Sequence, residues 1–354
     1  MESTHPIWER ALARELERTL ESLPEAGEVS SQKNKEPGYD YLMEFRLGKQ
    51  PVRLLVECKR VAYPRDIREF APTWERLASH RKAVPLLACE SISTPLREEL
   101  RKLKVGYYDL AGSLYLPLKT GGYILVDRPP ARRPSGQLDV FEGKAQRIVH
   151  QLLHEFDEWH RVSLLAHQCG VAPSTASRTL AELERHGWIE ARGAGPRKER
   201  KAVRPTELLD AWAEATRARP ALPLGRYFVP SASGLDAVLA RVTPAFRSRV
   251  IYAVTHQAAA QIYAPFLTDV QTVRLRAYAD SALATALVEI RAESEKEGAN
   301  LAIIEQADAL DVNTAETRNG IHLASPVQVY IDLQTGEGRS KEVAEHLRKE
   351  VIGF

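Results

Sequence analysis

The sequence predicts a multidomain α/β protein, and three observations lead to this fold class. The chain has 354 residues, which at about 150 residues per domain corresponds to two or three domains. Its 44% hydrophobic and 27% charged residues are typical of globular proteins and exclude a disordered or collagen-like chain. Strand-like and helical patterns both occur, and two Pro-rich stretches, 128–137 and 218–225, interrupt them. We therefore expect domains over 1–130, 138–218 and 225–354.

The cysteines and the distribution of apolar residues predict a cytoplasmic protein. Cys58, Cys89 and Cys169 lie far apart in mostly apolar stretches, which indicates reduced, buried thiols. Charged residues interrupt the first 20 positions, so no signal-peptide core is present there. No run of about 18 apolar residues occurs, and we expect no membrane partner.

The first domain is predicted to begin with a helix over 6–22, where apolar residues recur at helical spacing. A polar loop is expected over 27–38, followed by strands over 40–46 and 52–58 with a hairpin turn at 47–50. The remaining elements expected in this domain are helices over 64–82 and 94–104 and strands over 84–89, 105–110, 113–116 and 123–126.

Two carboxylates and a lysine lie at the open end of the predicted hairpin, away from its turn. Asp40 begins its first strand, and Glu57 and Lys59 end the second on a shared face, because side chains alternate with a period of two. Asp40 and Glu57 could hold Mg²⁺ or Mn²⁺, and Lys59 could help to orient a hydroxide for phosphodiester hydrolysis. These three are the candidate catalytic residues. The other interpretation is a solvated sheet face without chemistry.

This pattern resembles the PD-(D/E)xK restriction-endonuclease-like superfamily, and the order helix, three strands, helix, strand matches it. The resemblance implies a restriction-endonuclease-like α/β domain and, if the site is active, a metal-dependent DNA endonuclease. Gly38-Tyr39 stands where a proline often precedes the aspartate, which argues against activity. The first helix offers a further carboxylate, and the sequence leaves four candidates open: Glu9, Glu15, Glu17 and Glu21.

The middle domain is predicted to be a helix-turn-helix. Apolar residues there follow a 3.6-residue period, and Gly170 stands where the first of two helices must end. The helices are expected over 140–157, 163–169, 173–186 and 205–218. The exposed face of the 173–186 helix is predicted to carry hydroxyls and one arginine that suit phosphates and base edges in a major groove: Ser174, Thr175, Ser177, Arg178 and Thr179.

A basic hairpin over 188–204 is expected to follow as the wing of a winged helix. Gly193-Ala194-Gly195-Pro196 would form its tip, and Glu199 is the only acidic residue between Arg192 and Arg204, a stretch that holds six cations. These cations would contact the phosphates of double-stranded DNA without a cofactor: Arg192, Arg197, Lys198, Arg200, Lys201 and Arg204. Winged helices also serve as protein-interaction modules, so that alternative remains open.

The last third mixes both periods and predicts a C-terminal α/β domain. Strands are expected over 250–253, 273–277, 300–304 and 320–323, and helices over 281–297, 326–333 and 338–351.

Two sequence blocks carry a second resemblance. VGYYDLAGSLYL at 105–116 and SPVQVYIDLQTGEGRSKEVAEHL at 325–347 are similar to the AbiEi-type family of type IV toxin–antitoxin antitoxins and transcriptional regulators. The resemblance implies a DNA-binding repressor or antitoxin, often encoded beside a nucleotidyltransferase-like toxin. Because operators are usually read by dimers, we expect a homodimer. A regulator, a nuclease and a toxin-neutralising interaction module therefore remain three alternatives.

The same resemblance suggests that the C-terminal domain is related to nucleotidyltransferases. A working nucleotidyltransferase needs a Gly-Ser pair and paired carboxylates, whereas Thr255-His256-Gln257 stands at the corresponding strand end. Asp311 and Asp332 are isolated in the sequence. We therefore expect a degenerate domain that serves partner binding or dimerisation.

Overall fold

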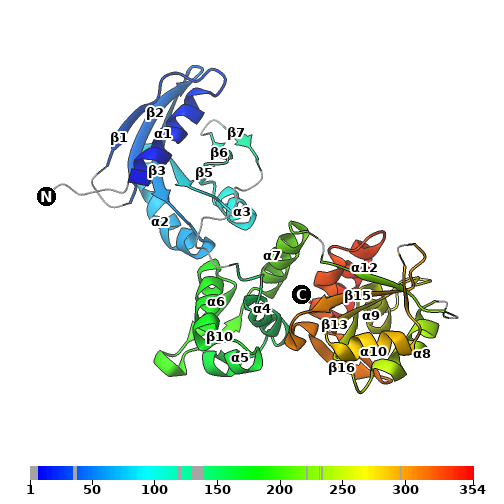
Figure 1. Cartoon of the computed structure of the whole chain (residues 1–354). Helices are drawn as coiled ribbons and strands as arrows, with labels where there is room; N and C mark the ends of the chain where they lie inside the picture. Colours follow the sequence, from blue (N-terminus) through cyan, green and yellow to red (C-terminus); the bar gives the residue numbers. More distant parts are fainter. Residues whose placement is uncertain are drawn as a thin grey trace. The chain divides into compact units, whose positions relative to one another are not determined.

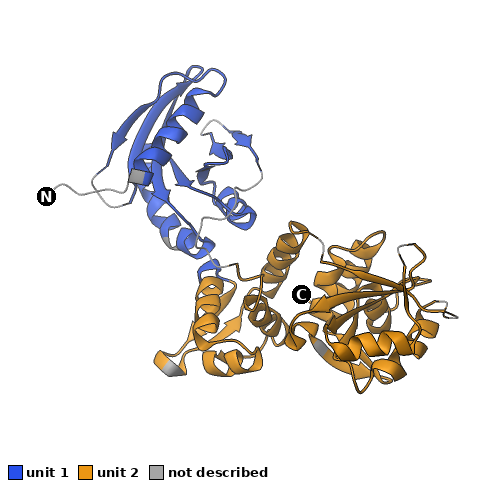
Figure 2. Cartoon of the chain, in the orientation of Figure 1, with its two compact units in different colours: residues 1–138, 185–187 blue, residues 139–184, 188–354 orange. Residues whose placement is uncertain are grey.

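The computed structural model describes residues 7–34, 38–118, 121–128, 139–220, 222–230, 232, 234–295 and 297–354. Figure 2 shows two compact units: residues 1–138 with 185–187 form unit 1, and residues 139–184 with 188–354 form unit 2. No helix among the described residues is both long and apolar enough to cross a membrane. The Pro-rich stretch predicted over 128–137 lies, from residue 129 onward, outside the described residues.

Unit 1 is built on one seven-stranded sheet whose strands follow one another in chain order (Figure 1). Its elements are α1 (Ile7–Glu21), β1 (Ser30–Lys33), β2 (Tyr41–Leu47), β3 (Gln50–Lys59), α2 (Pro64–Arg81), β4 (Val84–Cys89), α3 (Thr94–Lys102), β5 (Gly106–Asp109), β6 (Leu114–Pro117) and β7 (Tyr123–Val126). β3, β4 and β5 are parallel, and the other neighbouring pairs are antiparallel.

Helices cover both faces of this sheet. Successive side chains of a strand point to opposite sides, so neighbouring residues of one strand pack against different helices. Leu86 of β4 packs with Leu12 and Leu16 of α1. The next residue, Leu87, packs instead with Trp74 of α2 and Leu96 of α3. The central parallel strands are therefore buried on both faces, which explains their continuous apolar runs.

The 105–116 block forms β5, a tight turn and β6, and a buried aspartate organises it. Asp109 accepts hydrogen bonds from the backbone amides of Ala111 and Ser113 at 3.1 and 3.2 Å. Its other oxygen pairs with Arg97 of α3 at 2.7 Å, with both side chains almost fully buried. The 105–116 block thus has a structural role, and that role requires no ligand.

Two differences from the predicted unit 1 elements concern backbone pairing and helix length. β1 forms within the predicted 27–38 loop, because its polar residues pair with the edge of β2 rather than with a core. α3 ends at Lys102. Two residues later, Lys104 takes a left-handed φ of 54° and leads the chain into the next strand. The other predicted helices and strands of this unit are confirmed within a few residues.

The first part of unit 2 holds four helices and a small three-stranded sheet of order β8-β10-β9. Its elements are α4 (Ala145–His154), β8 (His160–Arg161), α5 (Val162–Gln168), α6 (Pro173–His186), β9 (Ile189–Arg192), the 3-10 turn η1 (Gly195–Arg197), β10 (Glu199–Ala202) and α7 (Pro205–Arg217). α4 is shorter than the helix expected over 140–157.

The C-terminal part of unit 2 is built on a mixed sheet of order β14-β11-β15-β13-β12-β17-β16, of which Figure 1 labels β13, β15 and β16. Its elements are β11 (Gly225–Phe228), α8 (Gly234–Phe246), β12 (Tyr252–Thr255), α9 (His256–Tyr263), β13 (Val273–Tyr278), α10 (Ser281–Glu289), β14 (Glu293–Ser294), β15 (Leu301–Gln306), η2 (Ala309–Val312), β16 (Thr314–Arg318), β17 (Ile321–Ala324), α11 (Pro326–Leu333), α12 (Ser340–Leu347) and η3 (Arg348–Ile352). α9 packs on β12 and β13, and α11 and α12 pack on α9.

The helix predicted over 281–297 ends much earlier. α10 stops at Glu289, buried Ile290 caps it, and Arg291 has a φ of 56° that turns the chain into β14. β11, α8 and α9 were not predicted, because their short apolar runs carry no distinct period.

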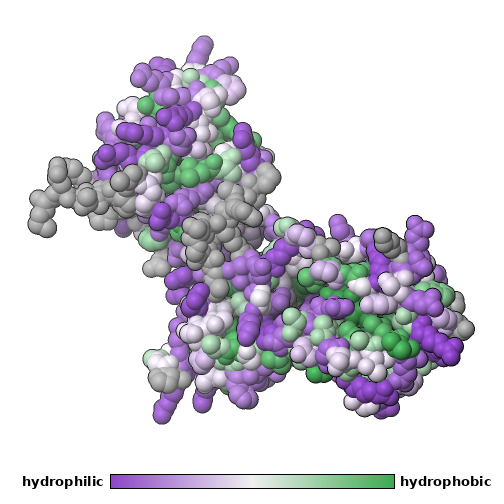
Figure 3. Space-filling model, in the orientation of Figure 1, coloured by the Kyte–Doolittle hydropathy of each residue, from purple (hydrophilic) through white to green (hydrophobic). Residues whose placement is uncertain are grey.

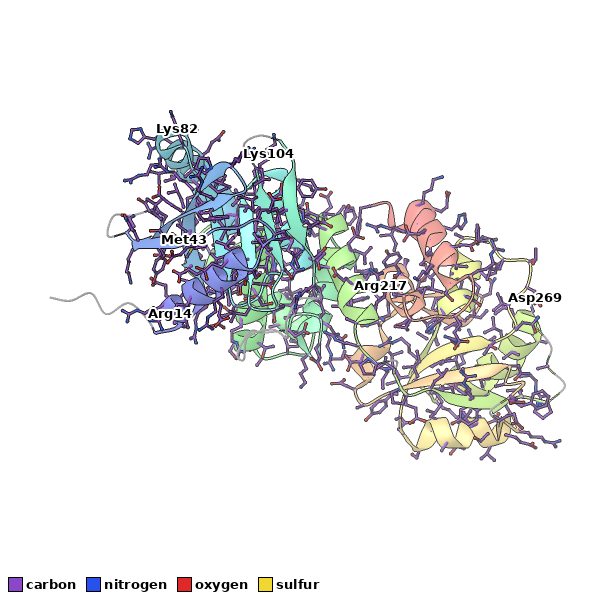
Figure 4. All side chains as sticks on the ribbon, turned by 90° about the horizontal axis from the view of Figure 1, so that it is seen from above. Arg14, Met43, Lys82, Lys104, Arg217 and Asp269 are labelled. Carbon is purple, nitrogen blue, oxygen red and sulfur yellow. The ribbon has the colours of Figure 1, made fainter. Side chains whose placement is uncertain are left out.

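Buried polar contacts join the two parts of unit 2. Arg147 of α4 is only 5% exposed and bonds Asp311 through two nitrogens, at 2.7 and 3.0 Å. His150 of the same helix hydrogen-bonds the hydroxyl of Ser325, the N-cap of α11, at 2.5 Å. Arg217, labelled at the end of α7 in Figure 4, donates to Gln334 at 2.6 Å. Specific side chains therefore link α4 and α7 to the C-terminal sheet and helices.

All three cysteines are buried and unpaired, as predicted from the sequence. Burial raises the pKa of each thiol above its usual value. The thiols are therefore protonated at neutral pH and unreactive.

Candidate nucleic-acid interface

α5 and α6 form two helices joined by a tight turn. Gly170 lies in this turn with a φ of 59°, a left-handed conformation that glycine adopts without strain. Leu165 of α5 is fully buried, as are Leu180 and Leu183 of α6. One face of each helix thus fills the core, and the opposite face of α6 is left to solvent.

The exposed face of α6 carries most of the predicted contact residues. Ser174, Ser177 and Arg178 are exposed, and Thr175 is half-buried. Thr179 differs from the prediction because it is fully buried and its hydroxyl donates to the carbonyl of Thr175 at 2.9 Å. Thr179 follows Arg178 in α6 and therefore lies on the adjacent side of the helix, which packs against the core.

β9 and β10 form the antiparallel hairpin expected over 188–204. Arg192 faces Glu199 in the register, and β10 also pairs with β8. Gly193 leaves β9 with a φ of 75°, and Gly195 follows with a φ of 58°. The glycines predicted for the tip are thus the residues that turn the chain.

Most hairpin cations are paired with carboxylates, which corrects the prediction that only Glu199 opposes them. Glu199 binds Arg192 at 2.8 Å and Arg161 at 3.2 Å, and their hydrogen bonds lower its pKa. The remaining pairs are Lys198–Glu184 at 3.2 Å, Arg200–Glu184 at 3.8 Å, Lys201–Asp157 at 2.5 Å and Arg204–Glu207 at 3.3 Å. Arg200 is also buried, with 7% exposure, so it cannot reach a phosphate in this conformation.

Two cations of this region form no ion pair with any described carboxylate. Arg178 projects from α6, and Arg197 lies at the hairpin tip in η1; both are exposed. Sequence reasoning missed this distinction between paired and unpaired cations. Glu184, Asp157 and Glu207 lie on neighbouring elements, and no local motif indicates their pairing.

Comparison with known protein families decides the nature of this region. Residues 143–193 match the IclR helix-turn-helix domain. The match covers α4, α5, α6 and β9 and leaves the rest of the chain unassigned. No curated protein and no solved structure matches the chain.

The helix-turn-helix domain supports a DNA-binding transcriptional regulator that binds double-stranded DNA. Its second helix is α6, the helix that carries the contact residues predicted from the sequence. The exposed hydroxyls and Arg178 therefore lie on the element that enters the major groove in helix-turn-helix proteins.

The second predicted site lies in unit 1, where Asp40 directly precedes β2 and Glu57 and Lys59 end β3. Asp40 accepts a hydrogen bond from the backbone amide of Cys58 at 2.7 Å. Cys58 packs in the core beneath α1, so Glu57 and Lys59 point to the opposite face of the sheet. The Lys59 ammonium lies 3.9 Å from the ring centroid of Phe70 in α2.

Two carboxylates, Asp40 and Glu9, influence Glu57. Burial, followed by the charges of Asp40 and Glu9, raises its pKa to about 7, whereas Lys59 acts in the opposite sense. Of the four helix carboxylates left open, Glu9 is thus the one near this site. Glu9 is itself buried and lies 3.4 Å from the Lys33 ammonium. Across the described residues, no three His, Cys, Asp or Glu side chains are arranged to hold a metal ion.

Proposed function

We propose that the chain is a transcriptional regulator that reads double-stranded DNA with a winged helix-turn-helix. α6 is the recognition helix, and the β9–β10 hairpin is the wing. The exposed face of α6, with two serine hydroxyls and the unpaired Arg178, carries this proposal. The similarity of residues 143–193 to the IclR helix-turn-helix domain supports it.

The two elements have different roles in this proposal. Arg178 has the donor geometry for a bidentate contact to guanine, and Ser174 and Ser177 suit base edges or phosphates. Arg197 at the hairpin tip contributes a phosphate contact, which fixes position rather than sequence. The paired cations of the hairpin contribute less, because each must first leave a carboxylate.

Sequencing of bound DNA tests the proposal. The full chain is incubated with a random-sequence duplex library in EDTA, and the bound fraction is amplified and sequenced. We expect enrichment of one motif, and Arg178→Ala should lose that enrichment while Arg241→Ala on α8 keeps it. A bound fraction with the composition of the input library would contradict sequence-specific binding.

We further infer that unit 1 has a restriction-endonuclease-like fold, which makes a metal-dependent DNA nuclease the second candidate function. The order α1, β1–β3, α2, β4 supports the fold. Asp40 contributes to the raised pKa of Glu57, and two neighbouring carboxylates could share a divalent cation. Against the activity, Lys59 is held by Phe70.

Plasmid cleavage distinguishes this second candidate. Under the nuclease hypothesis the full chain cuts plasmid DNA with Mg²⁺ or Mn²⁺, Lys59→Ala abolishes cutting, and Lys49→Ala, an exposed lysine of the same hairpin, retains it. Intact plasmid in every reaction, or equal cutting by all three proteins, would exclude the activity.

We also propose an antitoxin role with a nucleotidyltransferase-like toxin as partner and a homodimer as the DNA-binding form. The similarity of the 105–116 and 325–347 blocks to AbiEi-type antitoxins supports the role. Co-expression with such a toxin should yield a co-purifying complex and restore growth. The mass from light scattering should be twice the chain mass of 39.6 kDa. A monomeric mass would contradict the homodimer. A toxin that does not co-purify would contradict the antitoxin role.

A further inference from the structure

Unit 2 contains a cavity of about 300 Å³ that is lined by both of its parts. Gln146 of α4 and Trp212 of α7 line it from the helical part. Ile304 of β15 and Ile331 of α11 line it from the C-terminal part. In Figure 3 the visible surface of this C-terminal part mixes apolar (green) and hydrophilic (purple) side chains. The volume lies at the lower end of the range for small-molecule sites.

The cavity wall carries more positive than negative charge. Arg276 is neutralised, because it binds Asp332 at 2.7 Å and Gln306 at 3.1 Å. Arg226 and Arg274 also line the cavity, and neither forms an ion pair with a described carboxylate. Burial lowers the pKa of Arg274, and the carboxylate of Glu337, which lines the same cavity, acts in the opposite sense. With Glu337 as the only other described carboxylate that lines the cavity beside Asp332, these two arginines leave one positive charge that an anion between them would offset.

His256 adds an incomplete hydrogen-bonding group to the same wall. It begins α9 with a φ of 54°, an unusual conformation for a residue other than glycine. The side chain is 4% exposed, and its Nδ1 is buried without a hydrogen-bond partner among the described residues. Burial lowers its pKa to about 4, so the ring is neutral at neutral pH and Nδ1 either donates or accepts a hydrogen bond, depending on the tautomer. Buried polar groups are nearly always satisfied, so this nitrogen needs a partner that the described residues do not supply.

We propose that this cavity is an effector site for a small organic anion, a carboxylate or a phosphate ester. Arg274 and Arg226 bind its negative group, and His256 hydrogen-bonds a polar atom of the ligand. Trp212 and Ile331 contact its carbon skeleton. An inorganic ion alone would leave most of the volume unfilled.

The location of the cavity makes ligand binding relevant to DNA binding. α4 belongs to the helix-turn-helix domain and joins the C-terminal part through Arg147 and Asp311. A ligand that contacts Gln146 and Arg274 together therefore stabilises one arrangement of the two parts. Any change in DNA affinity must be matched by an equal change in ligand affinity. This regulatory part of the inference rests on the proposed function.

Ligand binding is tested on the full chain by thermal unfolding with three probes: inorganic phosphate, succinate and AMP. Ionic strength is held constant with NaCl. We expect succinate or AMP to raise the melting temperature of the wild type, with the stronger one identifying carboxylate or phosphate chemistry. Arg274→Gln and Arg226→Gln should lose the shift, and Arg241→Gln, outside the cavity, should keep it. No shift with any probe, or an unchanged shift in Arg274→Gln, would overturn the site.

The DNA affinity is then measured with and without the active probe. We expect at least a several-fold change in Kd for the wild type and no change for Arg274→Gln. An unchanged Kd would overturn the regulatory role while the cavity stands as a ligand site. A wild type that binds the probe but no DNA would instead refute the proposed function.

Discussion

Arg192 and Glu199 face each other across the β9–β10 hairpin, with Nη2 and Oε2 2.8 Å apart. Arg161 of β8 binds the same carboxylate at 3.2 Å. One glutamate therefore holds two arginines of a surface that we propose to contact DNA. To contact DNA, Arg161 and Arg192 would have to exchange the Glu199 carboxylate for a phosphate.

The first prediction follows from this competition. Glu199→Gln should raise the affinity for duplex DNA, because it releases Arg161 and Arg192 and removes a negative charge. Glu190→Gln is the matched control, since Glu190 lies exposed on β9 and forms no ion pair with a cation among the described residues. Fluorescence anisotropy with a labelled duplex measures both. If Glu199→Gln binds no more tightly than Glu190→Gln, the hairpin arginines do not contact phosphates.

Arg178→Ala should weaken binding to the selected site by about 1–3 kcal/mol if the guanidinium contacts a base. Its effect on non-specific duplex should be much smaller, because a base contact contributes only at the correct sequence. Competition binding with the selected and a scrambled duplex gives both affinities. Equal losses on the two duplexes would assign Arg178 to the DNA backbone instead.

Gly170→Ala should destabilise unit 2 by roughly 1–3 kcal/mol, because its φ of 59° is strained for alanine. A Cβ there would also lie 2.3 Å from Cδ1 of Leu310. Gly195→Ala is the matched control, since its φ of 58° is similar but no atom lies within 4 Å of the added Cβ. Urea unfolding should rank Gly170→Ala as the less stable variant, with partial recovery in Gly170→Ala/Leu310→Ala. Equal losses at both glycines would show that the packing against Leu310 is unimportant.

Acid should destabilise unit 2 through His150. Burial lowers the pKa of this histidine to about 3, whereas an unfolded histidine titrates near 6.5. Between these values the unfolded state binds more protons, so stability falls as the pH drops below about 6.5. His150→Gln, which can keep a hydrogen bond to Ser325, should lose less stability between pH 7 and 5 than the wild type.

His167→Gln on the surface of α5 is the control and should follow the wild type. Thermal unfolding over this pH range measures the three proteins. Parallel pH profiles for wild type and His150→Gln would contradict a neutral, buried His150.

Local patterns predicted much of this structure, and long-range contacts account for what they missed. The helix-turn-helix was predictable because Gly170, the apolar spacing and the Pro173 start all lie within a short window. The charge of the hairpin was equally visible. Its neutralisation was not, because Glu184 and Asp157 approach Lys198 and Lys201 only in the folded chain.

Burial on a helix face was likewise predicted only approximately. A rotation of one position separates exposed Arg178 from buried Thr179, and sequence spacing cannot resolve that difference when both residues are polar. The C-terminal cavity had no local signal at all. Arg226, His256 and Arg274 come from three separate elements, so only the sheet order brings them to one wall.

The salt dependence of DNA binding tests the central claim most directly. Kd for the selected duplex is measured over a range of NaCl concentrations for the wild type and for Arg178→Ala/Arg197→Ala, with Arg241→Ala as control. We expect the double variant to bind more weakly, because the base contact of Arg178 is lost, and its slope of log K against log salt to fall by about 1, for the lost phosphate contact of Arg197. The same affinity and slope in the double variant and the wild type would contradict DNA recognition by α6 and the β9–β10 hairpin.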